Sequence, residues 1–183
     1  MKQIILIINL ITFLSLHSFG QTNSNKTDIL WGPEIKASKR STLTDIIGYD
    51  ETGIYAIKTK NTGIYGWNST LYLEHYNEKM SQSRSVELDL KFELEEKKRE
   101  SLFEFIIHVD NEIYLFSSLK NQKKNLLFIQ GINKKTLQAD KNIKQIAEID
   151  YSENTIFNSG NFNYKISNDS TKILIYYNLP YNR

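Results

Sequence analysis

The chain of 183 residues contains no cysteine, only two prolines and only eight glycines. Without cysteine, no disulfide braces the fold, and both thiol catalysis and cysteine-ligated zinc are excluded. The 23 basic and 21 acidic side chains leave a formal charge of +2. A chain so close to neutrality lacks the strongly basic surface of a nucleic-acid binder, so we expect no nucleic-acid partner.

A long apolar run stands at the N-terminus. Lys2 precedes an apolar stretch from Ile4 to Leu16, and small residues occupy the −3 and −1 positions of a cut before Gln21. This pattern is typical of a secretory signal peptide over residues 1–20. The alternative is a membrane anchor, but the uncharged stretch Gln3–Phe19 has 17 residues, fewer than the roughly 20 that span a bilayer. We therefore expect a periplasmic or extracellular protein with no transmembrane span after cleavage.

Short runs rich in β-branched and aromatic residues recur after residues 21–41, which we expect to form a leader and a first polar segment. Each run has about 5–7 residues and is bounded by turn-forming residues, a pattern that predicts an all-β fold of antiparallel strands. The expected strands are 43–49, 54–59, 71–76, 86–90, 103–109, 113–117, 126–132, 146–150, 162–166 and 172–177.

The order of these runs repeats along the chain. Asp50 lies 60 residues before Asp110, which lies 59 before Asp169, and Ile54 lies 59 before Ile113. Four short antiparallel strands per unit, at a period of roughly 40–60 residues, are typical of propeller blades. The sequence therefore predicts about two and a half four-stranded blades of an incomplete propeller. The expected units are a first repeat at 42–90, a second at 102–150 and a partial third at 151–183.

Two architectures are compatible with this repeat. The chain is either part of a longer propeller protein or a twisted open sheet or sandwich, and we favour the propeller-like architecture. An unfinished third unit predicts an exposed strand edge at Lys172–Tyr177. Residues 91–101 are expected to form a charged connection between the first two units. Charge pairs in the stretch Lys91–Glu100 are compatible with about two turns of helix. We interpret this stretch as a solvated connection, and the alternative is a partner-binding segment.

Two segments resemble known propeller repeats. Asp110–Phe116 resembles the polar turn and hydrophobic strand of such blades, and Asn168–Leu174 is similar to the Ser-x-Asp-Gly element of TolB-like and WD-repeat blades. Ser170 and Thr171 depart from that element because they replace its glycine. The resemblance extends loosely over residues 42–178 and is to uncharacterised exported propeller-repeat proteins of Gram-negative bacteria. It implies a propeller fold and no shared catalytic residues.

Few side chains suggest chemistry. His75 and His108 lie within expected strands, one per repeat, and we interpret both as structural because no second ligand stands at metal-binding spacing. The aspartates at 50, 110 and 169 fall in expected turns, where their side chains bond nearby backbone N–H groups. We therefore predict no catalytic residue, no metal and no cofactor.

Three aromatic residues are candidates for ligand binding. Tyr65, Trp67 and Tyr72 lie close together in sequence, and on an exposed rim they would stack on sugar rings or anchor a partner. The alternative is that they are packed between sheets. The sequence thus predicts a non-catalytic binding or scaffold module with an unknown protein or glycan partner. The alternatives are the propeller portion of an extracytoplasmic glycosidase or peptidase, whose catalytic residues lie outside this chain, and a surface protein engaged in host or envelope contacts.

Overall fold

The structure is a computed structural model that describes residues 31–34, 39–61, 69–94, 96–121, 124–150 and 161–178. The chain divides into two units, Met1–Trp31 and Gly32–Arg183, and the strands belong to the second. The expected signal peptide and most of the segment 21–41 lie outside the described residues. Within the described ranges, no helix has the length and apolar character needed to cross a membrane.

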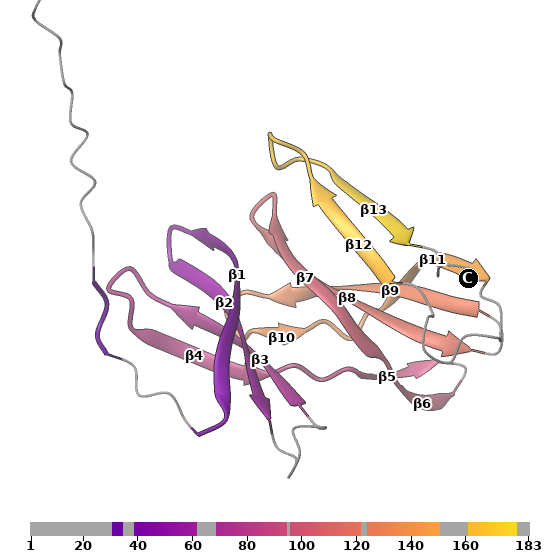
Figure 1. Cartoon of the computed structure of the whole chain (residues 1–183), viewed down its shortest axis with the longest axis horizontal. Helices are drawn as coiled ribbons and strands as arrows, with labels where there is room; N and C mark the ends of the chain where they lie inside the picture. Colours follow the sequence, from indigo (N-terminus) through magenta and orange to yellow (C-terminus); the bar gives the residue numbers. More distant parts are fainter. Residues whose placement is uncertain are drawn as a thin grey trace, which may run out of the picture. The chain divides into compact units, whose positions relative to one another are not determined.

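The described residues form strands and turns, which confirms the predicted all-β class (Figure 1). The described residues of this unit form two larger antiparallel sheets and two hairpins. The first sheet has the order β1 (Ser41–Asp50), β2 (Gly53–Asn61), β3 (Ser69–Tyr76) and β4 (Gln82–Glu87). The second has β7 (Leu102–Val109), β8 (Glu112–Asn121) and β9 (Lys124–Asn133), with β10 (Gln138–Ala139) and β11 (Lys144–Asp150) both paired to β9. The hairpins are β5 (Lys91–Leu94) with β6 (Lys97–Glu100), and β12 (Asn161–Ile166) with β13 (Ile173–Asn178).

Each of the ten strands expected from the sequence has a counterpart, as β1–β4, β7–β9 and β11–β13. The helical possibility for Lys91–Glu100 is wrong, because the described residues of this stretch form the hairpin of β5 and β6. The alternation in Lys91–Leu94 has the period of a strand, and it places Phe92 where its ring packs on Phe128 with 5.0 Å between ring centroids. That contact outweighs the helical charge pairs, which stabilise by only about 0.2–0.5 kcal/mol each.

The turns at the three expected aspartates differ in their chemistry. The Thr52 backbone N–H donates to Asp50 (2.8 Å) and that of Thr171 to Asp169 (3.2 Å), as expected for aspartates that stabilise turns. Asp110 and Asn111 instead both adopt positive φ, at 50° and 61°. This is the two-residue type I′ arrangement whose twist matches the flanking strands, and Asp and Asn tolerate it.

A first hydrophobic core lies between the two larger sheets. Alternate residues of β2 and β3 point into it from one side, and alternate residues of β7, β8 and β9 from the other. Its buried members are Tyr55, Ile57, Leu73, Leu88, Ile106, Ile113, Leu115, Ile132 and Leu137. The second sheet therefore covers the inward face of the first.

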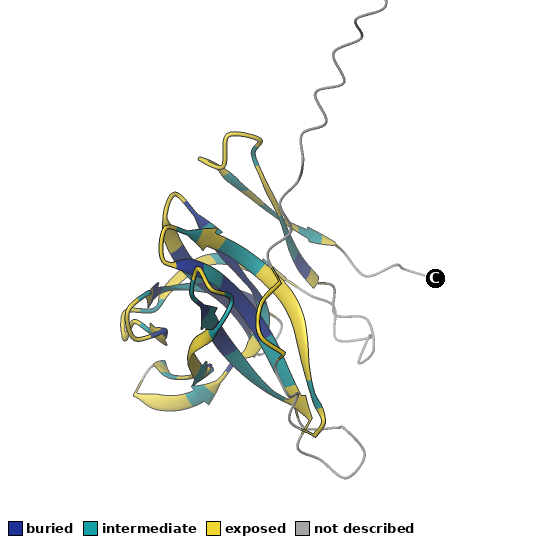
Figure 2. Cartoon of the chain, turned by 90° about the vertical axis from the view of Figure 1, so that its left-hand side faces the viewer, coloured by how far each residue is buried: buried dark blue, intermediate teal, exposed yellow. Residues whose placement is uncertain are grey.

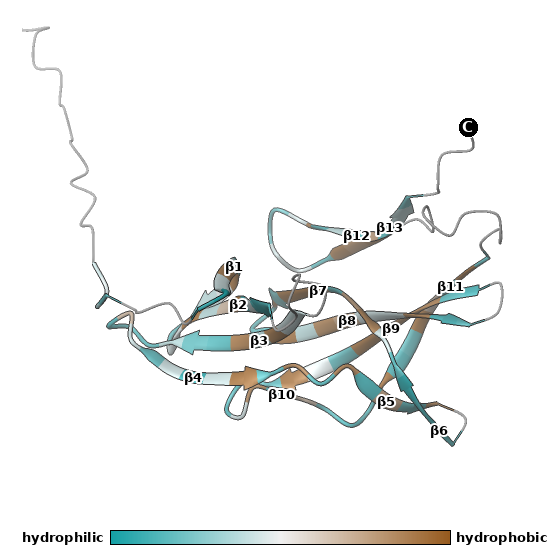
Figure 3. Cartoon of the chain, turned by 60° about the horizontal axis from the view of Figure 1, so that its bottom comes forward, coloured by the Kyte–Doolittle hydropathy of each residue, from teal (hydrophilic) through white to brown (hydrophobic). Residues whose placement is uncertain are grey.

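A second core lies on the opposite face of the second sheet, against the β12–β13 hairpin. The intervening residues of β7 and β8 point into it, and Tyr164 of β12 packs on Phe105 with 4.6 Å between ring centroids. Its buried members are Phe105, Ile107, Val109, Phe116, Leu127 and Phe162. The second sheet is thus buried on both faces. In Figure 2 the buried residues lie along strands, and the turns are exposed. Figure 3 shows the same concentration as hydrophobic stretches along β8, β9 and β12.

The first strand of the second sheet, β7, contacts both β1 and β12. At the contact with β1, Gly48 faces His108, and a Cβ atom built on Gly48 would lie 2.5 Å from the His108 Cβ atom. No rotamer change of His108 relieves that approach, because its Cβ atom is fixed to the β7 backbone. Glycine at position 48 is therefore required for the close approach of the two strands.

We predict that Gly48→Ala destabilises the fold by about 1–3 kcal/mol, because β1 and β7 must separate to accommodate the methyl group. Gly131→Ala is the matched control, since a Cβ atom there meets only the Asp140 carboxylate, the free end of a side chain, at 2.6 Å. Urea unfolding of both variants measures the difference. Equal stability of Gly48→Ala and Gly131→Ala would contradict the packing of β1 on β7.

Candidate functional site

Of the three candidate ligand-binding aromatics, Tyr65 and Trp67 lie outside the described residues. Tyr72 lies on β3 and is half-buried. The Lys58 ammonium stands 5.8 Å from the centroid of its ring, close enough for a cation–π contact. Part of the Tyr72 ring is therefore covered by a neighbouring side chain and is not wholly free for a ligand.

Glu74, the neighbour of that pair on the same face, is fully buried. Its carboxylate accepts hydrogen bonds from Lys58 Nζ (2.5 Å), the Tyr76 hydroxyl (2.6 Å), Ser85 Oγ (2.9 Å) and Gln82 Nε2 (3.2 Å). Burial raises its pKa, but the bonds from Lys58, Tyr76 and Ser85 outweigh burial, so the pKa of Glu74 lies below its ordinary value. We call Lys58, Glu74, Tyr76, Gln82 and Ser85 the Glu74 network, and its filled acceptor sites indicate a structural role.

A second polar group joins the turns of the two larger sheets. Lys134, in the turn between β9 and β10, donates to Asp50 of β1 (2.6 Å) and to Asn111 in the β7–β8 turn (2.5 Å). Asp50 also accepts from the hydroxyls of Tyr55 (3.0 Å) and Thr52 (2.6 Å). We call these five residues the Asp50 cluster. It links the first sheet to the second by charge-assisted hydrogen bonds, beside the first core.

Two histidines extend the Asp50 cluster. The Tyr55 ring lies between His75 and His108, with ring centroids 4.8 Å and 5.7 Å away. Thr52 Oγ1 lies 3.1 Å from His75 Nε2 and 2.6 Å from Asp50 Oδ1. The Thr52 hydroxyl proton goes to the carboxylate, so a hydrogen bond between Thr52 and His75 requires the tautomer of His75 with a proton on Nε2. In that tautomer His75 offers Thr52 no lone pair with which to act as its general base.

The surroundings of His108 disfavour the charged form of its imidazole. Burial lowers the pKa of its imidazole, and the positive charge of Lys134 lowers it further. Its Nε2 atom is buried without a hydrogen-bond partner among the described residues. The interpretation of both histidines as structural stays a prediction.

We predict that Asp50→Asn destabilises the fold by about 1–3 kcal/mol at neutral pH, because Lys134 loses its charged acceptor. Burial raises the pKa of Asp50, but the hydrogen bonds from Lys134, Thr52 and Tyr55 outweigh burial and hold it far below its ordinary value. A folded-state pKa below the unfolded one stabilises the fold above about pH 4, and this contribution is lost as the pH falls further.

Urea unfolding across pH 2–7 measures the effect, with the exposed Glu51→Gln as the control one residue away. The stability gap between wild type and Asp50→Asn is expected to narrow below about pH 4. A gap that is independent of pH would show that the Asp50 charge contributes nothing.

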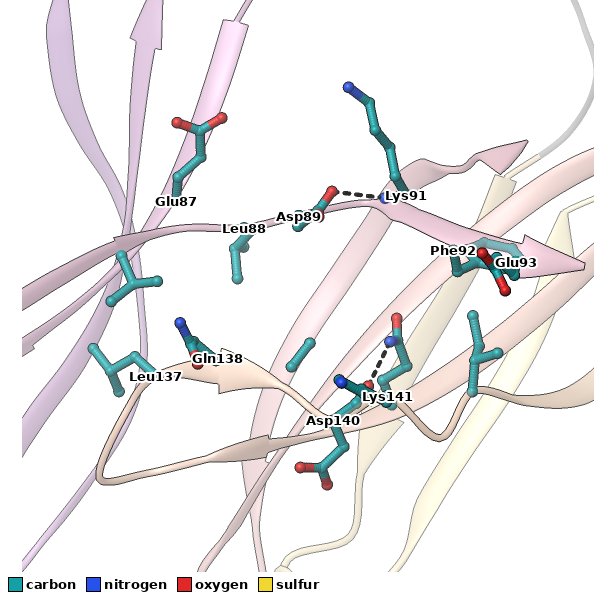
Figure 4. Close-up of a pocket in the computed structure, with 14 residues that line it drawn as sticks. Glu87, Leu88, Asp89, Lys91, Phe92, Glu93, Leu137, Gln138, Asp140 and Lys141 are labelled. Carbon is teal, nitrogen blue, oxygen red and sulfur yellow. Dashed lines mark hydrogen bonds between the residues drawn. The ribbon is translucent and has the colours of Figure 1, made fainter. Parts of the chain in front are cut away.

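A cleft of about 590 Å³ opens where the outer edges of the two larger sheets meet (Figure 4). One wall is the segment Val86–Glu93, which runs from the end of β4 into β5, and the other is Leu137–Ile143 with Gln130 of β9. Leu88 points from the first wall toward the second in Figure 4 and belongs to the first core. The volume falls within the roughly 300–1,000 Å³ that is usual for ligand pockets.

Local hydrogen bonds hold both walls of the cleft in place. Asp89 accepts from the Lys91 backbone N–H (3.0 Å), which fixes the bend before β5. On the other wall, Gln130 Nε2 donates to the Asp140 backbone carbonyl (2.9 Å), and the Asp140 N–H donates to the Gly131 carbonyl (2.8 Å). The walls are therefore set by the fold and do not depend on a ligand.

The lining of the cleft combines apolar and acidic groups. Val86, Phe92, Ala139 and Ile143 are half-buried and provide the apolar surface. Four acidic side chains against two lysines give the lining a net charge of −2; these residues are Glu87, Asp89, Glu93, Asp140, Lys91 and Lys141. The carboxylates of Glu87 and Asp140 point away from each other in Figure 4. The arrangement can hold an apolar group and attract cationic ones.

The cleft was not found from the sequence. Its walls come from the end of the first expected repeat, the charged connection and the polar stretch after β9, which lie far apart along the chain. The signal that could have located it is the alternation of charged and apolar residues in Lys91–Leu94. This alternation indicates a strand, and a strand here would place Phe92 on its apolar face. Within the described ranges, no group of three His, Asp or Glu side chains is arranged to hold a metal ion.

Comparisons of this chain with protein-family models, with curated proteins and with solved structures find no match.

Proposed function

We propose that this chain is a non-catalytic binding module that acts outside the cytoplasm, after removal of residues 1–20, and that the cleft holds a segment of a partner protein. The observation that carries the proposal is the cleft itself: a preformed, acidic groove with apolar surface at the meeting of two sheets. Clefts of this kind are the usual location of ligand sites. In the Asp50 cluster and the Glu74 network, the carboxylates already accept hydrogen bonds from neighbouring side chains. This arrangement favours a binding role over a catalytic one.

A peptide is a better occupant than a glycan. Sugar binding usually relies on an aromatic face that is free to stack. Phe92 is the aromatic residue among the cleft-lining residues, and its ring already packs on Phe128. An extended peptide instead needs apolar contact for alternate side chains and complementary charge, and both are present here. The expected segment carries apolar residues together with Lys or Arg.

We further propose that the sheets are propeller-like blades. The first four strands follow one another in space, as do β7, β8 and β9, with β11 also paired to β9. The first strands of the three units, β1, β7 and β12, lie in contact in turn. Ile54, Ile113 and Ile173 lie at or next to the start of the second strand of their sheets. Stacked meanders with their first strands adjacent are the arrangement of propeller blades.

We predict that the chain from Gln21 onward binds Lys- or Arg-containing apolar peptides on a peptide array, and that a glycan array gives no comparable signal. Two exposed cleft substitutions test the site: Glu93→Lys, which reverses a charge, and Gln138→Trp, which fills the groove. Each should weaken binding of the selected peptide about tenfold or more, equivalent to 1.4 kcal/mol.

The control is Glu78→Lys, an exposed charge reversal in the turn between β3 and β4. Added salt should weaken binding by wild type, because the charges at the rim are solvated. Calorimetric titration of the selected peptide into each protein gives the dissociation constants. Equal affinity in all four proteins would place the binding surface elsewhere, and glycan binding alone would refute the peptide proposal.

A further inference from the structure

The outward face of the first sheet carries an apolar cavity. It has a volume of about 200 Å³ and lies over β1, β2 and the end of β3. Its lining residues are Gly32, Pro33, Leu43, Ile46, Ile54, Ala56, Tyr76 and Met80. Leu43 and Ile46 are 48% and 60% exposed, a high value for large apolar side chains on a strand.

The outward face of the β12–β13 hairpin is also apolar and exposed. Leu174 and Tyr176 of β13 are 61% and 37% exposed, and Ile166 of β12 is 36% exposed. The alternate residues of β13, which are Ile173, Ile175 and Tyr177, pack on the second core. The hairpin therefore uses one face inside the unit and leaves the other uncovered among the described residues.

The hairpin face and the cavity lining match positions that pack together elsewhere in the chain. Leu174 and Tyr176 lie 60 residues after Tyr114 and Phe116, which face the second core from β8. In the cavity lining, Ile54 is half-buried and Ala56 is buried beneath the exposed Leu43 and Ile46 side chains of β1. Ile54 and Ala56 lie 59 residues before Ile113 and Leu115, which belong to the first core between the two larger sheets. The hairpin face thus corresponds to the side of a sheet that packs on the next sheet along the chain. The cavity lining corresponds to the side that packs on the preceding sheet.

We propose that a second copy of this chain docks the outward face of its β12–β13 hairpin into the cavity over β1 and β2. The contact would reproduce, between molecules, the two sheet-to-sheet contacts that each chain makes internally. Its extent also fits, because a two-stranded hairpin covers two strands and the cavity lies mainly over the first two strands of the sheet. Beyond the cavity, the same face carries polar side chains that already donate hydrogen bonds to Glu74, namely Lys58, Gln82 and Ser85.

Such a contact is head-to-tail, because it joins two different surfaces. Each dimer keeps one free cavity and one free hairpin face, so association either continues or closes into a ring. The proposal concerns a surface separate from the cleft, and Glu93→Lys should leave self-association unchanged.

The experiment measures association of the chain from Gln21 onward by sedimentation velocity over a range of concentrations. Ile46→Glu blocks the cavity, Leu174→Glu blocks the hairpin face, and Leu102→Glu is a control at a β7 residue that is 57% exposed. Wild type and Leu102→Glu should self-associate, and each interface variant alone should be at least about tenfold weaker. A 1:1 mixture of Ile46→Glu and Leu174→Glu should restore a dimer, since each supplies the surface that the other lacks.

Several results would overturn the proposal. A monomeric wild type at all concentrations would mean that no second copy covers the cavity. Association that survives in either single variant would indicate a symmetric contact or pairing along the β13 edge. A mixture that stays monomeric, while both variants unfold with the thermal midpoint of wild type, would also refute it, because folding defects could not then explain the loss.

Discussion

The second sheet has apolar side chains on both of its faces, and the rest of the structure depends on covering them. Neighbouring residues of β8 show the constraint directly: Leu115 belongs to the first core and Phe116 to the second, and both are about 1% exposed. One sheet cannot bury two faces by itself, so it needs a layer on each side. The first sheet and the β12–β13 hairpin provide those layers.

Polar contacts fix how the first two sheets meet. The hydrophobic effect is non-directional and sets no register between stacked sheets. The Asp50 cluster supplies direction, because Lys134 can reach both Asp50 and Asn111 only when three turns from two sheets lie together. Gly48 acts in the same region by letting β1 approach β7 at His108. These contacts also position the edges of the two sheets, and the cleft opens between those edges.

The strands were predictable from the sequence because their signal is local. Runs such as Phe103–Val109 are rich in β-branched and aromatic residues, and the turn residues Asp110 and Asn111 mark the end of this run. The β5–β6 hairpin was not predicted from the charge pairs of Lys91–Glu100, because the Phe92–Phe128 contact joins residues that are distant in sequence. The contacts of Tyr55 with His75 and His108 could not be predicted either, because they also join residues that are distant in sequence. Sequence patterns locate the strands, but the packing of sheet on sheet decides which side chains meet.

The most direct test of a sheet buried on both faces is a measurement of proton–proton proximity by nuclear Overhauser effects at Phe105 and Ile106, adjacent residues of β7. The account predicts that Phe105 contacts Tyr164 of β12, whose ring centroid lies 4.6 Å from its own, and that Ile106 contacts Ile57 or other first-core residues. Contacts from both residues to the same neighbouring sheet, or none from Phe105 to β12, would contradict the account.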